Sequence, residues 1–148
     1  MAYKAVPGSC GIAPRFSITC GLQEGYGSDA KLHTVDEVIE LVLKHLKDCA
    51  ASGKPYLTGS VTTGEVVYAW PEGEGKAGGG HEPQATYSGE KNPLYNEAMT
   101  DEEVINFLSC LAEVFGSALG QTRVYIIYDG DMWIIQQEET TTPTGEKV

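Results

Sequence analysis

Two segments of this chain carry the full signature of an amphipathic helix, and segments with strand periodicity flank both. Residues 34–37 (TVDE) and 100–103 (TDEE) are capping boxes, in which the threonine oxygen accepts from the third helical residue and the glutamate reaches back. Gly53 and Gly120 are expected to end the two helices. Each start is followed by an apolar stripe at helical spacing, made of Val35, Val38, Ile39, Val42, Leu46 and Cys49 in the first helix and of Val104, Phe107, Leu108, Leu111, Phe115 and Ala118 in the second.

The remaining periodic segments alternate as strands do. Residues 15–22 (RFSITCGL) predict a half-buried strand, and residues 54–70 predict a hairpin that turns near Thr63 and Gly64. Residues 123–137 predict a second hairpin, because Asp129 and Gly130 favour a tight type I′ turn. The order strand, helix, hairpin, helix, hairpin predicts an α+β fold. We expect an antiparallel sheet of about five strands with two helices on one face, a split β-α-β (ferredoxin-like) layout of βαββαβ plus one extra strand.

One face of such a sheet is left uncovered by the helices. Depending on register, it would carry Tyr56, Tyr68, Tyr125 or Trp133. Exposed aromatic patches of this kind mark contact surfaces. The long loop or a second subunit would therefore have to cover them, and a homo-oligomer is expected.

The ends of the chain are predicted to be less regular than its centre. Residues 1–137 are expected to form a single α+β domain that begins with an irregular arm over 1–14, and the polar residues 138–148 predict a disordered tail. No apolar run reaches the ~20 residues of a membrane span. Since a signal-peptide core is also missing, a cytoplasmic location is expected.

Charge is distributed unevenly along the chain. The net charge is −11, and residues 97–148 hold ten acids against two bases, a net charge of −8. Arg15 and Arg123 are the only arginines, so the clustered cations that bind phosphate backbones are missing and direct nucleic-acid binding is not expected. The acidic C-terminal third either keeps the protein soluble or attracts a basic protein surface.

Residues 71–99 show no periodicity and are predicted to be a long Gly-rich loop insertion. The segment holds six of the eighteen glycines and three of the seven prolines. Loops longer than about 12–15 residues are usually either functional or disordered. This loop is therefore the candidate functional segment, either as a contact surface or as a cover for the open sheet face.

Motifs that would identify a reaction are missing. His81 and Glu82 resemble half of a metalloprotease motif, but the second histidine is missing and Pro83 breaks a helix there. The four cysteines are widely spaced and are interpreted as structural. The glycines of 73–80 fit neither a Walker loop nor a dinucleotide fingerprint. We predict no catalytic residue, no metal ligand and no cofactor.

Three functions remain open. The first is a non-enzymatic acidic binding protein, an inhibitor that engages a basic protein surface through the 71–99 loop and the acidic third. The second is a protein that binds or sequesters a planar or phosphorylated small molecule at a subunit interface. The third is a small enzyme that uses His81 as acid or base. The predicted ligand- or partner-binding residues are Lys54, Trp70, His81, Glu82, Tyr87, Lys91, Tyr95 and Arg123.

Overall fold

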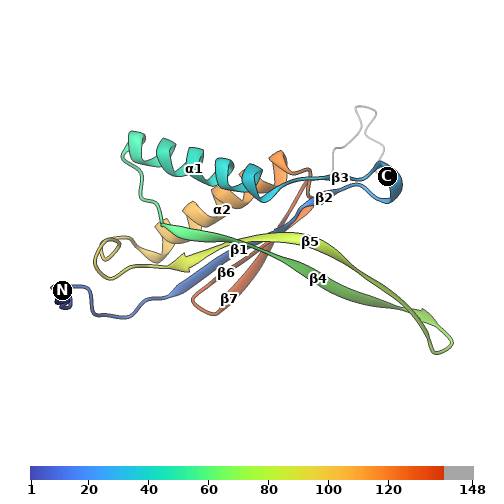
Figure 1. Cartoon of the computed structure of the whole chain (residues 1–148), viewed down its shortest axis with the longest axis horizontal. Helices are drawn as coiled ribbons and strands as arrows, with labels where there is room; N and C mark the ends of the chain where they lie inside the picture. Colours follow the sequence, from blue (N-terminus) through green and yellow to red (C-terminus); the bar gives the residue numbers. More distant parts are fainter. Residues whose placement is uncertain (139–148) are drawn as a thin grey trace.

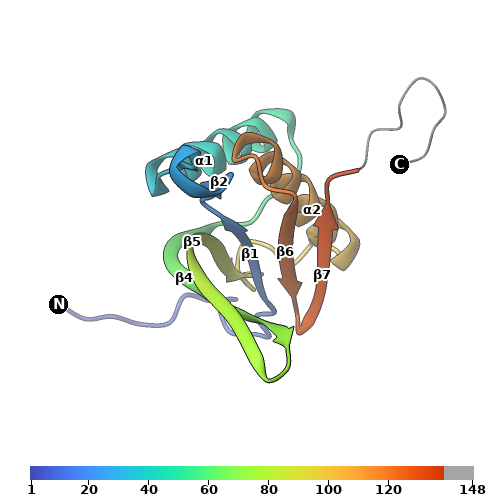
Figure 2. The ribbon, with the colours of Figure 1, turned by 90° about the vertical axis from the view of Figure 1, so that its right-hand side faces the viewer.

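The computed structural model describes residues 1–138 and shows the predicted α+β architecture. Two helices cover one face of a five-stranded antiparallel sheet whose strand order is β4-β5-β1-β6-β7 (Figures 1 and 2). This order is the split β-α-β arrangement with one strand added at its edge. In chain order the elements are β1 (Arg15–Gly21), β2 (Gln23–Glu24), η1 (Gly27–Asp29), β3 (Lys31–Leu32), α1 (Val35–Ser52), β4 (Gly59–Gly73), β5 (Lys76–Glu90), α2 (Asp101–Ala118), β6 (Arg123–Tyr128) and β7 (Asp131–Gln136).

Both helices begin and end where the sequence predicts. Thr34 and Thr100 are the N-caps, and both capping boxes are complete, with Glu37 and Glu103 as the third helical residues. Gly53 ends α1 in the left-handed conformation, at φ 70°, and Gly120 follows α2 at φ 62°. Each glycine allows the chain to leave its helix abruptly, which a side chain would resist.

The core lies between the helices and the sheet. Alternate residues of β1 and β6 point into it, since Phe16, Ile18 and Cys20 are buried, as are Val124, Ile126 and Tyr128. The helices contribute the stripe positions Val38, Val42, Val104, Phe107, Leu108, Leu111 and Phe115. Two cysteines, Cys20 and Cys49, are buried in this core, whereas Cys10 and Cys110 are exposed, and all four are free thiols.

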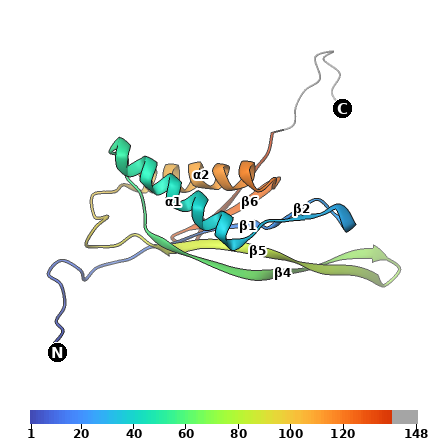
Figure 3. The ribbon, with the colours of Figure 1, turned by 45° about the horizontal axis from the view of Figure 1, so that its top comes forward.

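The predicted loop over 71–99 is wrong for most of its length. β4 and β5 run continuously to a turn at Glu74 and Gly75, with no turn at the predicted Thr63 and Gly64. The last pair between β1 and β5 joins Gly21 to Gln84, whereas β4 and β5 stay paired as far as Gly73 and Lys76. The distal part of this hairpin, residues 65–83, therefore projects beyond the sheet, and we call it the hairpin arm (Figures 1 and 3).

Glycines in the hairpin arm make room for aromatic rings. The rings of Tyr68 and Trp70 stack with 6.0 Å between centroids, and both lie across from glycines of β5. A Cβ atom at Gly78 would lie 2.6 Å from the Trp70 ring. The glycine run that resembles a flexible loop in the sequence is therefore a strand on which two rings lie.

The open face of the sheet carries only some of the predicted aromatics. Tyr125 is partly exposed there, whereas Tyr68 is partly exposed on the hairpin arm beyond the sheet. Trp133 packs against the core, and Tyr56 lies on the linker before β4. Ile127, Met132 and Ile134 are also exposed, so the face is apolar. Self-association through this face stays a prediction. Within residues 1–138, no helix combines the length and apolarity that crossing a membrane requires.

Two buried tyrosines make the stability of the protein depend on pH in the alkaline range. Burial raises the pKa of Tyr87 to about 12, and its hydroxyl donates to the Leu57 carbonyl at 2.7 Å. Burial and a hydrogen bond to Asp101 raise the pKa of Tyr128 to about 12. Tyrosine in an unfolded chain titrates near pH 10, roughly, so the unfolded state loses these protons first. The stabilisation is complete below that pH and is lost as the pH rises towards 12.

We expect the free energy of unfolding to fall between about pH 9 and pH 11, as measured by urea denaturation. The double variant Tyr87→Phe/Tyr128→Phe has no hydroxyls to titrate at these sites, so it should lose less stability over the same interval. An equal loss in the parent and the variant would show that other groups cause the decline.

Candidate functional site

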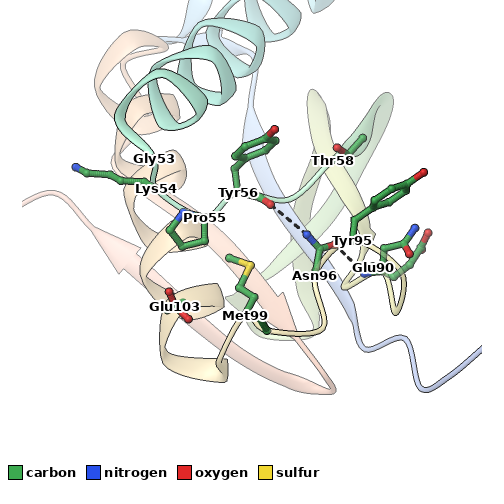
Figure 4. A pocket seen from close by; sticks show the side chains of 12 residues that line it. Gly53, Lys54, Pro55, Tyr56, Thr58, Glu90, Tyr95, Asn96, Met99 and Glu103 are labelled. Carbon is green, nitrogen blue, oxygen red and sulfur yellow. Dashed lines mark hydrogen bonds between the residues drawn. The ribbon is translucent and has the colours of Figure 1, made fainter. Parts of the chain in front are cut away.

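A cavity lies where two linkers meet at one end of the helical layer. Residues 53–58 connect α1 to β4, and residues 91–100 connect β5 to α2. The cavity has a volume of about 760 Å³, and we call it the linker pocket (Figure 4). It is lined by Gly53, Lys54, Pro55, Tyr56, Thr58, Glu90, Asn92, Tyr95, Asn96, Ala98, Met99 and Glu103.

The first wall is fixed by the end of α1 and by the core. The Lys54 amide donates to the Cys49 carbonyl at 2.9 Å, which completes the helix end at Gly53. Leu57 is fully buried, and its carbonyl accepts the Tyr87 hydroxyl. Lys54 and Tyr56 are thus held between two anchored positions and lie at the pocket with their side chains exposed.

The second wall is a loop that is held by its own side chains. The Asn96 carboxamide oxygen accepts from the Asn92 amide at 2.9 Å, and the Asn92 carboxamide oxygen accepts from the Leu94 amide at 2.8 Å. Buried Met99 anchors the end of the loop, just before the N-cap of α2. The Asn96 side-chain nitrogen also donates to the Tyr56 carbonyl at 3.4 Å, so it bridges the two walls (Figure 4).

The chemistry of the linker pocket is aromatic and acidic. Tyr56 and Tyr95 are 39% and 79% exposed, which leaves both rings available to a ligand. Lys54 is the single cation among the lining residues, and Glu90 and Glu103 are the two anions. One Glu103 oxygen already accepts from the Thr100 amide at 3.0 Å in the capping box. The arrangement suits a planar ligand that carries positive charge.

The structure brings only two of the eight predicted ligand residues together. Lys54 and Tyr95 line the linker pocket, whereas the backbone of neighbouring Lys91 bonds to Pro14 outside it. Arg123 begins β6, where its Nε donates to the Gln136 side chain at 3.0 Å. Tyr87 is only 1% exposed, so the prediction that it lies on a contact surface is wrong.

The other three predicted residues, Trp70, His81 and Glu82, lie on the hairpin arm. His81 Nδ1 is 3.5 Å from a Glu65 carboxylate oxygen, and Glu82 accepts from the Tyr68 hydroxyl at 3.1 Å on the opposite face of the arm. None of them lines the linker pocket. The hypothesis of His81 as acid or base therefore does not fit this site. Among residues 1–138, no three His, Cys, Asp or Glu side chains gather in a way that would hold a metal ion.

Sequence reasoning did not bring Tyr56, Glu90, Asn96 and Glu103 together. In the sequence, Glu103 is accounted for by the capping box of the second helix. Glu90 lies in the segment that was predicted to be a loop and that ends strand β5 in the structure. The available signal was the topology itself, because a split β-α-β layout places the end of the first helix and the start of the second at the same end of the sheet.

No family model and no curated protein matches the sequence of this chain. Two solved structures share its fold. Phage SAM lyase in complex with S-methyl-5'-thioadenosine matches with a TM-score of 0.60, over 93% of this chain and 97% of that chain, at 16% identity. Phage SAM lyase in its apo state matches with a TM-score of 0.61, over 95% and 99% of the two chains, also at 16% identity.

These comparisons correct the first predicted function. The non-enzymatic binding protein, or inhibitor, relied on a long loop that is in fact a hairpin. The solved proteins that share the fold along nearly the whole chain are lyases, and one of them holds a small ligand. The prediction of an inhibitor of a basic protein surface is therefore wrong. At 16% identity, the likeness itself shows the fold.

Proposed function

We propose that this chain is a lyase that cleaves S-adenosylmethionine (SAM) and releases S-methyl-5'-thioadenosine from the linker pocket. The observation that carries the proposal is the fold shared with phage SAM lyase across 93% of this chain. The pocket supports it independently, because its volume of about 760 Å³ lies within the usual range for small-molecule sites.

The lining residues complement the three parts of SAM. The adenine ring is planar and suits stacking on Tyr95 or Tyr56. The sulfonium and the ammonium group are cations and suit Glu90 and Glu103, while the carboxylate suits Lys54. SAM has a net charge of +1, and the three charged lining residues have a formal net charge of −1.

A lyase breaks the carbon–sulfur bond without consuming water. In one route the substrate carboxylate attacks the γ-carbon, the bonding electron pair goes to sulfur, and homoserine lactone forms. In the other, a base removes a β-proton, a carbon–carbon double bond forms, and sulfur again takes the electron pair. Lys54 would orient the carboxylate in the first route, and Glu90 or Glu103 would accept the proton in the second.

Both routes turn the sulfonium into a neutral thioether. The product S-methyl-5'-thioadenosine lacks the positive charges that Glu90 and Glu103 attract. Its affinity therefore depends on the adenosine contacts alone. Loss of charge attraction at the moment of bond cleavage favours release of the product.

Incubation of the purified chain with SAM tests the proposal. Liquid chromatography with mass spectrometry should show S-methyl-5'-thioadenosine above the level formed in buffer alone, together with a four-carbon fragment. The lactone and the alkene are isomers of equal mass, so their chromatographic retention against authentic standards separates them. Homoserine that carries ¹⁸O from labelled water at the earliest times would instead indicate hydrolysis, and no product above the buffer control would rule out the proposed function.

Replacing Tyr95 by alanine should weaken binding of substrate and product alike. Both contain adenosine, and stacking of a base on an aromatic ring contributes about 1–3 kcal/mol, so each dissociation constant should rise on the order of 10-fold. Isothermal titration with S-methyl-5'-thioadenosine and steady-state kinetics with SAM measure the two effects.

Lys54→Met provides the contrast to Tyr95→Ala, because the product has no carboxylate for Lys54 to bind. This variant should raise KM for SAM and leave the affinity for S-methyl-5'-thioadenosine unchanged. If Tyr95→Ala also affected only SAM, the adenosine would not lie on this ring.

A further inference from the structure

The N-terminal segment runs along the outside of the linker pocket. Residues 8–14 contain no helix or strand, and they pass beside the loop of residues 91–96 that forms the second wall (Figure 4). The Lys91 amide donates to the Pro14 carbonyl at 2.8 Å, which extends the pairing of β1 and β5 by one further bond.

Glycines bring the two segments into direct contact. A Cβ atom at Gly11 would lie 3.2 Å from the Pro93 Cβ atom, so a larger side chain there would have to push the ring away. Gly8, at φ 82°, lies against the Leu94 side chain, with 3.8 Å between its Cβ position and Cδ1. Pro93 and Leu94 are both half-buried, although they belong to no helix or strand.

The pocket side of the same loop is held less firmly. Its one cross-wall hydrogen bond joins Asn96 to the Tyr56 carbonyl at 3.4 Å, which is long for an N–H···O bond, and it lies at an exposed position. The remaining side-chain bonds, between Asn92, Leu94 and Asn96, stay within the loop. The two ends of the loop are anchored by β5 and by buried Met99, and the contacts with the N-terminal segment hold its middle, at Pro93 and Leu94.

We propose that residues 8–14 are a strap that positions the loop wall of the linker pocket, so that ligand affinity depends on this N-terminal segment. The inference rests on the proposed function for the identity of the ligand. A loop that is ordered before binding loses less conformational entropy when the ligand arrives, which raises affinity without any added contact. Gly11, Pro14 and Gly8 are thus positioning residues and touch no substrate.

The test replaces Gly11 by valine in the full chain, with Ile12→Ala as the matched control. Ile12 belongs to the same segment but is 90% exposed, so its side chain supports nothing. Hydrogen exchange followed by mass spectrometry reports on the loop without any ligand. Peptides spanning 91–96 should exchange about 10-fold faster in Gly11→Val, while peptides from α1 and β1 stay unchanged. The dissociation constant for S-methyl-5'-thioadenosine should rise on the order of 10-fold.

The two readouts separate the strap from the proposed function. Unchanged exchange in Gly11→Val, or faster exchange with an unchanged dissociation constant, overturns the strap. Faster exchange in Gly11→Val, in a chain whose parent form cleaves no SAM and binds no S-methyl-5'-thioadenosine, overturns the proposed function but supports the contact that positions the loop. Equal effects of Gly11→Val and Ile12→Ala would also overturn the strap, because Gly11 lies against Pro93 whereas the Ile12 side chain is 90% exposed.

Discussion

Glutamine at both position 90 and position 103 is expected to lower kcat/KM for SAM by about 100-fold or more. Hydrogen bonds to charged groups contribute about 1.5–3 kcal/mol each, and the double variant removes two carboxylates from the linker pocket at once. The amide oxygen that Glu103→Gln introduces can still accept from the Thr100 backbone, so the cap of α2 is kept. Steady-state kinetics and the mid-point of thermal unfolding check both parts of the prediction.

The control for this variant carries the same change of charge on the same stretch of chain. Glu97→Gln/Glu102→Gln also removes two negative charges, but neither residue lines the linker pocket. It should leave kcat/KM within about twofold, since surface charges act weakly across screened distances. Similar losses in both double variants would mean that overall acidity, and not the pocket, attracts the substrate.

Binding of the neutral product gives the sharper discrimination. Because S-methyl-5'-thioadenosine has no positive charge, Glu90→Gln/Glu103→Gln should bind it as tightly as the parent chain. Loss of substrate affinity with intact product affinity would place the two carboxylates at the cationic end of SAM. Together with the loss of both affinities expected for Tyr95→Ala, this would orient the ligand in the pocket without a structure of the complex.

Local signals in the sequence were sufficient for the helices and for the last hairpin. The capping boxes at Thr34 and Thr100 are complete, and each satisfies backbone amides within a few residues. The start of each helix therefore depends little on contacts with distant parts of the chain. Asp129 and Gly130 both adopt positive φ, at 51° and 86°, as a type I′ turn requires. With the first strand and the alternation of helices and strands along the chain, these elements are enough to predict the two layers and the α+β class.

The β4–β5 hairpin was missed because its signals conflict. Its turn residues, Glu74 and Gly75, adopt positive φ as in the last hairpin, but glutamate is an unusual residue there. Pro83 normally argues against a strand, yet it lies one residue beyond the last β1–β5 pair, where no amide of its own is needed. Its carbonyl accepts from the Leu22 amide at 3.0 Å, and the Leu22 carbonyl accepts from the His33 amide instead. The three glycines of 78–80 lower strand propensity. The packing of Trp70 over Gly78 and of Tyr68 over Gly80 explains two of them, and a Cβ atom at Gly79 would meet the backbone of β4.

The linker pocket could not be predicted from local patterns, because no single segment contains it. Its two walls are more than thirty residues apart, and each reads as an ordinary connection between elements. Because the hairpin turn was predicted at Thr63 and Gly64, residues 71–99 were interpreted as a functional loop, although residues 76–90 of that segment form β5. Lys54 and Tyr95 were selected for their chemistry alone, and the antiparallel layout is what brings them to one cavity.

Leu108→Ala is expected to cost about 2–5 kcal/mol of the free energy of unfolding, a large part of the 5–15 kcal/mol typical of a whole domain. Leu108 is fully buried on α2, in the cluster that joins both helices to the sheet. Truncation removes buried methyl groups and leaves a cavity that the surrounding packed side chains fill only in part. Urea denaturation monitored by circular dichroism measures the change at equilibrium.

Ile105→Ala is the matched control for Leu108→Ala, since it removes a similar apolar side chain from the same helix. Ile105 is 41% exposed, so its truncation should cost well under half as much. A comparable loss at both positions would mean that Ile105 is covered in solution. Because the covering surface would then come from another molecule, that outcome would also indicate self-association through the helical layer instead of the open sheet face. A dependence of the Ile105→Ala effect on protein concentration would establish this, because dissociation of an oligomer follows mass action.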